Sequence, residues 1–316
     1  MNGDNSFQDS SKSNTRYLFQ AKTDEAFVIK IVGELLSQRL KFAPFKVTPD
    51  GIFLLKMDPK KQQLIEISLE KTNFSPYKCS KPIIFSVNTT HLYKMLKCIK
   101  KKDGLRLFIH EDDPHNLGIC VEQRGEGNRV TTFLKITMTH PEDIQKPEGY
   151  DPPIIIQSKQ FQKMKNLHSI AETMTITSKL NYIKFFCDGG ELYSRELVIG
   201  DENDEDNAHI KKVYKQNFNT QHITGLTKCA GQSSNVQVFV HEDLGLKIKM
   251  KAGALGEITV YIKSKELIQD EEEEKGIDEE EITELTKDIQ LRDDDDDEPV
   301  KKQPVKRKRT EESKRK

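Results

Sequence analysis

The sequence predicts an α+β fold of two similar domains, each an antiparallel sheet with two short helices, followed by a disordered charged C-terminal tail. Two observations carry this prediction. Most of the chain between Tyr17 and about Lys265 reads as short strands with a few short helical stripes. The chain also repeats itself at a spacing of 131 residues, because Lys97-Cys98, Phe108–Asp112 and His91 return as Lys228-Cys229, Phe239–Asp243 and His222. A fixed internal repeat indicates two copies of one structural unit.

The helical elements follow from apolar residues that recur every three or four positions. Val28, Ile29, Val32, Leu35 and Leu36 form the first stripe. The second stripe consists of Leu92, Met95, Leu96 and Ile99, with Thr89 or Thr90 as its expected N-cap. Weaker helical patterns cover Phe161–Leu167 and Ile223–Ala230. The sequence therefore predicts four helices, two in each repeat.

The strands follow from short runs in which apolar and polar residues alternate. They are expected at Phe45–Thr48, Ile52–Met57, Leu64–Leu69, Leu105–Ile109, Val130–Met138, Thr173–Thr177, Ile183–Phe186, Val236–Val240, Leu246–Met250 and Ile258–Ile262.

The domain boundary is expected in the proline-rich segment 140–153, which favours an extended connector over a packed element. We therefore expect a disordered extension at 1–16, a first domain at 17–138, a connector at 139–153, a second domain at 154–265 and a disordered acidic then basic tail at 266–316.

Charge is distributed unevenly along a chain whose net charge is −1. From Glu266 to the end there are 12 basic and 20 acidic residues, which leaves 38 basic and 31 acidic residues before Glu266. A basic body favours contact with a polyanion. The N-terminus holds no apolar stretch, and no apolar run approaches the roughly 18 residues of a membrane span. Five scattered cysteines argue against a disulfide framework. We expect an intracellular protein that does not act at a membrane.

Lysines lie on the polar side of the predicted helices. Lys94, Lys97 and Lys101 are spaced three and four apart, opposite the apolar stripe of the second helix. The other three helices contribute Lys30, Lys163, Lys165 and Lys228. Lysine neutralises phosphates without reading bases, so these faces suit DNA binding that does not depend on sequence. Taken alone, however, they would also suit an ordinary solvated surface.

No catalytic or metal site can be named from the sequence. His110-Glu-Asp-Asp-Pro-His115 resembles a metal cluster, but neighbouring residues on a strand point to opposite faces and cannot converge. The repeat of this segment, His241-Glu-Asp243, also lacks the second histidine. Phosphate-binding glycine loops and nucleophile motifs are missing as well. We expect a protein without enzymatic activity, cofactor or metal.

Several segments together resemble the proliferating cell nuclear antigen (PCNA) family of DNA sliding clamps. The resemblance rests on Leu18–Ala21, Phe45–Ile52, Leu55–Asp58, Phe74–Cys79, Ser86–Thr89, Leu92–Cys98, Gly190–Leu192, Thr227-Lys228 and Val260–Ile262. It covers roughly residues 17–265 and implies a head-to-tail homotrimeric ring around double-stranded DNA, with the helices lining the hole. The seven lysines named above would then face DNA.

The resemblance also implies two protein interfaces. A groove under the connector would take short client peptides that carry a glutamine and paired aromatics, and its walls would be Met57, Leu64, Ile144, Tyr261 and Ile262. The subunit interface would pair the strand 130–138 with the strand 192–199 of a neighbour, through Thr132, Leu134, Ile136, Leu192, Ser194 and Leu197.

These inferences predict a DNA polymerase processivity factor that docks replication and repair enzymes and is placed on DNA by a clamp loader. A subunit of a heterotrimeric checkpoint-type clamp, a viral processivity factor that forms no ring, and an acidic-tailed chaperone remain as alternatives. Lys306, Arg307, Lys308 and Arg309 read as a nuclear localisation signal, so the nucleus is the expected location, or a viral replication compartment if the source is viral.

Overall fold

The computed structural model describes residues 16–125, 127–179, 182–201 and 213–274. The first half contains β1 (Tyr17–Thr23), α1 (Ala26–Arg39), β2 (Phe42–Thr48), β3 (Gly51–Met57), β4 (Gln63–Glu70), the 3₁₀ helix η1 (Lys71–Asn73), β5 (Tyr77–Cys79), β6 (Ile83–Asn88), α2 (Thr89–Leu96), β7 (Gly104–His110), β8 (Asn116–Gln123) and β9 (Asn128–Met138).

The second half contains β10 (Ile154–Gln157), α3 (Ser158–Phe161), the 3₁₀ helix η2 (Gln162–Ser169), β11 (Thr173–Ser178), β12 (Ile183–Asp188), β13 (Ser194–Ile199), β14 (Tyr214–Asn219), α5 (Thr220–Thr224), α6 (Thr227–Ala230), β15 (Asn235–His241), β16 (Gly245–Ala252) and β17 (Gly256–Ile262). A further helix covers 265–274. The described residues up to Ile268 form one compact unit, and Gln269–Lys316 belong to a second.

The sequence repeat is a repeat of structure. Adding 131 to the bounds of β6 and β7 gives the bounds of β14 and β15, and the same shift carries the first residue of β2 and of β4 onto those of β11 and β13. The shift also relates two helix caps, because Asn88 accepts a hydrogen bond from the His91 amide at 3.0 Å and Asn219 accepts one from the Gln221 amide at 2.9 Å. Asparagine is a favoured N-cap, so Asn88 takes the position expected for Thr89 or Thr90.

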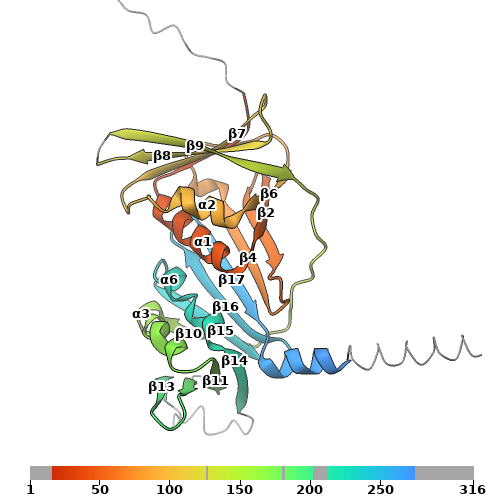
Figure 1. Cartoon of the computed structure of the whole chain (residues 1–316), viewed down its shortest axis with the longest axis vertical. Coiled ribbons are helices and arrows are strands. Elements are labelled where there is room, and N and C mark those ends of the chain that lie inside the picture. Colours follow the sequence, from red (N-terminus) through yellow and green to blue (C-terminus); the bar gives the residue numbers. More distant parts are fainter. Residues whose placement is uncertain (1–15, 126, 180–181, 202–212, 275–316) are drawn as a thin grey trace, which may run out of the picture. The chain divides into compact units, whose positions relative to one another are not determined.

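The strands of the described residues, drawn as arrows in Figure 1, pair antiparallel and form two sheets. The larger sheet has thirteen strands in the order β10-β15-β16-β17-β4-β3-β2-β6-β9-β8-β7-β1-β5, and the smaller has the order β13-β12-β11-β14. The two halves join where β17 pairs with β4, with Tyr261 opposite Leu64. The smaller sheet reproduces the order β4-β3-β2-β6 of the first half, which confirms the expected α+β fold of two similar parts.

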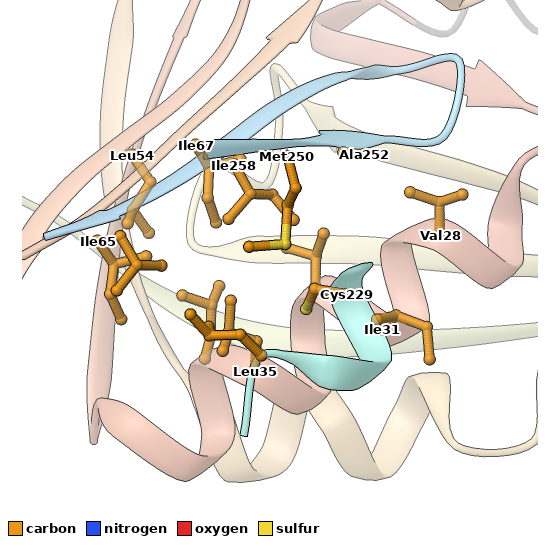
Figure 2. Close-up of a cluster of buried hydrophobic side chains, with 14 of the residues drawn as sticks. Val28, Ile31, Leu35, Leu54, Ile65, Ile67, Cys229, Met250, Ala252 and Ile258 are labelled. Atoms are coloured by element: carbon orange, nitrogen blue, oxygen red, sulfur yellow. The ribbon is translucent and has the colours of Figure 1, made fainter. Parts of the chain in front are cut away.

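The helices cover one face of the larger sheet, and the core lies between them. Figure 2 shows side chains of α1 and α6 meeting side chains of β3, β4, β16 and β17. Val28, Leu35 and Cys229 come from the helices, and Ile65 and Met250 come from the strands. Both halves therefore contribute side chains to one apolar cluster.

Close packing of α1 on α2 explains the glycine in the middle of α1. A Cβ atom at Gly33 would lie 2.9 Å from Cδ1 of Leu96, so a larger residue there would force the Leu96 side chain to move. Ile31 of α1 is buried in the core, whereas Phe27 lies beneath the ammonium group of Lys30 at 5.5 Å from the ring centroid. These residues therefore build the helix layer and leave the lysines outside it.

Candidate nucleic-acid and partner interface

The structure places the lysines expected to face DNA on or beside the helices that cover the core. Lys94 and Lys97 are exposed on α2 and at its C-cap, and Lys163 and Lys165 are exposed on η2. None of these four has an ion pair among the described residues. They form the free part of this lysine face.

The other three lysines are already engaged. Lys30 donates to the carbonyl oxygen of Ile99 at 2.8 Å, and Lys228 forms an ion pair with Glu34. The α2 helix ends at Leu96, so Lys101 lies beyond it rather than on it, with its ammonium group 6.0 Å from the Phe27 ring centroid. These three lysines add positive charge to the face, but each would have to loosen an internal contact to reach a phosphate.

A cleft of about 770 Å³ opens where the two halves meet, and positive side chains line it. Its basic residues are Arg39, Lys60, Lys165, His168, His222 and Lys228, whereas Asp58 is the acidic one. Asp58 is buried and accepts hydrogen bonds from the amides of Gln62 and Gln63 at 2.8 and 2.6 Å. The cleft therefore offers a net positive surface next to the free lysine face. Sequence analysis missed Arg39 and Lys60, because neither belongs to a helical lysine pattern.

Arg39 ties the two halves together inside this cleft. Its guanidinium donates to the side-chain oxygen of Gln63 and to the backbone carbonyl oxygens of Gln221 and His222, the last at 3.0 Å. Burial lowers the pKa of Arg39 to about 10. Burial also lowers the pKa of His222 to about 4, with the positive charge of Arg39 adding to the effect. At pH 7 the Arg39 guanidinium is therefore charged and the His222 imidazole is neutral.

Three residues expected to line a client groove, Met57, Leu64 and Tyr261, share the face of the larger sheet that lies opposite the helices. Direct cross-strand pairing places Lys247, Tyr261, Leu64 and Met57 in one row across β16, β17, β4 and β3, and paired residues share a face. Tyr261 and Leu64 are only 6% and 3% exposed, so the middle of this row is covered in the structure. Ile262 is fully buried in the core on the other face, so its side chain does not line the groove with Tyr261.

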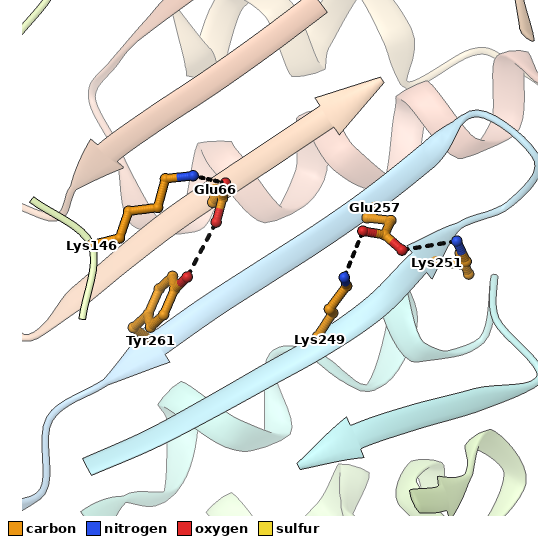
Figure 3. A network of polar contacts seen from close by, with 6 residues as sticks. All are labelled: Glu66, Lys146, Lys249, Lys251, Glu257 and Tyr261. Carbon is orange, nitrogen blue, oxygen red and sulfur yellow. Dashed lines mark hydrogen bonds and ion pairs between the residues drawn. The ribbon is translucent and has the colours of Figure 1, made fainter. Parts of the chain in front are cut away.

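Ion pairs hold the connector over this row. Lys146 pairs with Glu66, whose other oxygen accepts a hydrogen bond from the Tyr261 hydroxyl at 3.2 Å (Figure 3). A second ion pair joins Glu142 to Lys56. Burial raises the pKa of Tyr261 to about 12, with the Glu66 carboxylate adding to the effect, so the hydroxyl stays a donor at neutral pH. Ile144, the connector residue expected in the groove, is half-buried between these two ion pairs.

Several strands have an edge without a strand partner among the described residues, at the sheet ends β5, β10, β13 and β14 and along the first part of β9. β13 pairs with β12 alone, and β9 pairs with β8 along its first part and with β6 only from Ile136 onwards. Large apolar side chains are exposed on β9 and on or just before β13, namely Val130, Phe133, Leu192, Tyr193 and Val198. Of the residues expected at a subunit seam, Leu192 and Ser194 are exposed and Thr132 and Leu197 are partly so, but Leu134 and Ile136 point into the core.

The described residues contain no group of three histidine, cysteine, aspartate or glutamate side chains that could hold a metal ion. His110 packs instead against Tyr17, with the ring centroids 4.9 Å apart. Nor is any described helix long and apolar enough to cross a membrane. The basic cluster Lys306–Arg309 lies outside the described residues.

Repeated antiparallel domains, a lysine-bearing helix layer and a connector on the opposite face define the class of the sliding clamps. The chain belongs to the proliferating cell nuclear antigen family, because residues 18–142 match the N-terminal domain of that family and residues 144–265 match its C-terminal domain.

Relatives carry names of the same kind. The chain is 25% identical over 252 residues to "Probable DNA polymerase sliding clamp 1" of Paramecium bursaria Chlorella virus 1, a match that covers 78% of this chain and 96% of the relative. It is 25% identical to "Proliferating cell nuclear antigen" of Chaetomium thermophilum, covering 78% and 98% of the two chains. The "DNA polymerase sliding clamp" of Cenarchaeum symbiosum is 24% identical, with 77% and 97% covered.

Proposed function

We propose that this chain is a DNA sliding clamp that closes into a head-to-tail homotrimer around double-stranded DNA and serves as a processivity factor without catalysing a reaction itself. A closed ring cannot leave DNA by sliding, so an enzyme bound to the ring keeps a high effective concentration along the duplex. The names of the relatives and the family membership support this function.

The main support for a ring is that β13 is the counterpart of β4 in the repeat. In the repeat, β13 corresponds to β4, and β4 joins the halves by pairing with β17. The counterpart of β17 in the first half is β9, and both β9 and β13 have an edge without a strand partner among the described residues. A β13–β9 contact between neighbouring copies would therefore repeat the joint that β4 and β17 make within one copy.

The same relation predicts the register of that contact. Leu54 and Phe185 are equivalent in the repeat and pair with Ile67 and Leu197, so Leu197 is the counterpart of Ile67. The ladders on the other side make Val130 the counterpart of Ile258, because Val121 pairs with Val130 where Met250 pairs with Ile258. Since Ile67 lies opposite Ile258, Leu197 is placed opposite Val130. Leu197 is partly exposed and Val130 is 46% exposed. Their burial in the ring would remove apolar surface from water on each side of the seam.

DNA is proposed to lie against the helix layer. The four free lysines and the basic cleft present positive charge on the face opposite the connector. Charges of this kind suit contacts to phosphates, which do not depend on the base sequence. The client groove is proposed on the connector face, around Met57, Leu64 and Tyr261, with a DNA polymerase and other replication or repair enzymes as clients and a clamp loader to open the ring.

Light scattering after size exclusion, performed on the full chain over a dilution series, tests the ring. A homotrimer has a mass of three times 36.4 kDa and persists on dilution. A second measurement on nicked circular DNA then tests encirclement, because a closed ring stays on the circle and slides off once the circle is cut. A stable monomer would instead favour a heterotrimeric clamp subunit or a processivity factor that forms no ring.

The proposed location is the nucleus, on the basis of the basic cluster Lys306–Arg309. A fluorescent fusion of the full chain should collect in the nucleus of a eukaryotic cell, and replacing the four basic residues by alanine should spread it through the cell. An unchanged distribution after the replacement would remove this assignment.

A further inference from the structure

The ammonium group of Lys247 lies among three aromatic rings. Its Nζ atom is 4.7 Å from the ring centroid of Phe239, 5.4 Å from that of Tyr150 and 5.5 Å from that of Tyr261. The rings also contact one another, because Tyr150 packs edge-on against Phe239 at 6.2 Å and at a tilt against Tyr261 at 6.3 Å. We call these four residues the aromatic cage. Ring faces attract a cation, so the cage holds the lysine head in one place.

Each aromatic residue of the cage is held in place by the sheet or by a hydrogen bond. Phe239 lies directly opposite Lys247 on β15, and Tyr261 lies directly opposite it on β17. Tyr150 comes from the connector and is fixed by a hydrogen bond from its hydroxyl to the carbonyl oxygen of Leu244 at 3.0 Å. The position of the ammonium group is thus set before any partner arrives, which lowers the entropy cost of binding.

Lys247 has no anionic partner within the described chain, unlike its neighbours on the same face. Two residues further along β16, Lys249 pairs with Glu257 at 2.8 Å, and Lys251 pairs with the same carboxylate (Figure 3). The carboxylate of Glu66 is occupied by Lys146 and the hydroxyl of Tyr261. Lys247 is half-buried yet makes no ion pair or hydrogen bond to a described residue. A part-buried cation in an apolar cage is a strong attachment point for an anion.

The cage adjoins the proposed client groove. Lys247, Tyr261, Leu64 and Met57 form the cross-strand row described above, and Tyr261 belongs both to the cage and to the groove. Tyr150, which closes the cage, belongs to the connector that covers the row. A peptide that lies along the groove under the connector would therefore pass within reach of the Lys247 ammonium group.

We propose that the aromatic cage is an acidic-residue subsite of the groove, in which Lys247 binds an aspartate or glutamate side chain of the client peptide. This inference rests on the proposed client groove and adds a specificity element to it. A carboxylate beside the part-buried ammonium gains a charge interaction that is stronger than in water. An amide at the same place could accept a hydrogen bond from the ammonium but would bring no negative charge, so the subsite favours acid over amide.

The test uses the full chain and a set of synthetic peptides that carry a glutamine, an aliphatic residue and two adjacent aromatics. Each peptide has a single glutamate at one flanking position and is paired with its glutamine counterpart. Fluorescence anisotropy should find a position at which glutamate binds about tenfold more tightly than glutamine. Lys247→Met keeps an unbranched apolar side chain in the cage and should abolish that preference. Lys249→Met removes the same charge from the same face and should retain it.

Each other result overturns the proposal. If glutamate and glutamine peptides bind the unaltered protein equally at every position, or if Lys247→Met keeps the preference, then the cage does not read an acid. If Lys249→Met loses the preference as fully as Lys247→Met, the effect is one of overall charge. If none of the peptides binds the unaltered protein, the client groove itself fails. Thermal unfolding of both variants verifies that each is folded.

Discussion

The guanidinium of Arg39 donates a hydrogen bond to the backbone carbonyl oxygen of His222, with 3.0 Å between the nitrogen and the oxygen. Arg39 is the last residue of α1 in the first half, and His222 lies in α5 of the second. The last carbonyl groups of a helix have no partner inside it, and a cation at that end also favours the helix dipole. One side chain thus completes a helix of the other half and fixes the two repeats relative to each other.

Replacing Arg39 by methionine should lower the free energy of unfolding by about 2–3 kcal/mol, because the side-chain oxygen of buried Gln63 and the part-buried carbonyl oxygen of His222 lose this donor while an apolar stem is kept. Urea unfolding at pH 7 measures this loss. The matched control is Arg124→Met, because Arg124 makes an exposed ion pair with Asp24, worth about 0–1 kcal/mol. An equal loss in the two variants would show that the bond between the halves contributes no more than a surface contact.

The free lysines of the helix layer should set the salt dependence of DNA binding. Each neutralised phosphate contributes about −0.9 to the slope of log K against log salt for duplex DNA. Replacing Lys94, Lys97, Lys163 or Lys165 by glutamine should therefore flatten the slope in proportion to the number of phosphates that the lysine neutralises. Anisotropy titrations of a DNA duplex over a range of salt concentrations give this slope.

Two variants control for the removal of charge alone. Lys251→Gln removes one charge from the opposite face of the sheet, where the lysine pairs with Glu257, and should leave the slope unchanged. Lys228→Gln removes a lysine already paired with Glu34 and should have a smaller effect than Lys165→Gln. If Lys251→Gln flattened the slope as much as Lys165→Gln, DNA would not be bound by the helix face.

The register proposed for the subunit seam can be tested by charge exchange. Leu197→Lys should prevent assembly by placing an ammonium group against the apolar edge of a neighbour, and Val130→Glu should do the same with a carboxylate. The double variant should recover the assembled mass, because the two charges would face each other across every seam. Light scattering gives the mass of each protein.

A control variant separates this effect from general damage. Ile155→Lys alters an apolar residue that is 63% exposed on β10 and should leave the assembled mass unchanged. If the double variant remained as dissociated as either single one, Leu197 and Val130 would not be opposite each other. If both single variants assembled normally, β9 and β13 would not form the seam.

Much of the fold could be predicted because the signals are local. The apolar stripe of α1 and the alternation in β3, β4 and β16 appear directly in the sequence. Strands such as β6 and β14 were missed because they mix polar and apolar residues without a clear alternation. That the two strands are repeats of each other becomes visible only when their bounds are known from the structure. The pairing of β17 with β4 could not be predicted from pattern, because it joins segments almost two hundred residues apart.

Some residues of the candidate site could likewise be predicted from the sequence, and others could not. The exposed lysines of α2 and η2 could be predicted from helical spacing, and the structure leaves Lys94 and Lys165 free of ion pairs among the described residues. Ile262 was expected in the groove, but alternation along β17 turns it into the core while Tyr261 faces outward. Arg39 and Lys247 could not be predicted, because the partners of each come from segments distant in sequence.

The stability of the fold should fall in mild acid because of His222. Burial, the Arg39 guanidinium and Lys60 lower its pKa to about 4, against the opposing effect of Asp58. The unfolded chain takes up a proton near pH 6.5, whereas the folded chain does so only near pH 4. Below pH 6.5 the unfolded state therefore binds more protons, and stability falls as the pH drops from 6.5 towards 4.

Urea unfolding at pH 7.5 and pH 5.0 measures this contribution. After allowance for the solvent around a half-buried ring, about 1–2 kcal/mol of the acid-induced loss should belong to His222. His222→Gln should lose that much less stability between the two pH values than the unaltered protein does. His91, the exposed histidine at the equivalent position of the first repeat, supplies the control, because His91→Gln should keep the full pH dependence. If His222→Gln and His91→Gln showed the same pH dependence, the acid sensitivity would arise elsewhere, because only His222 is partly buried next to Arg39.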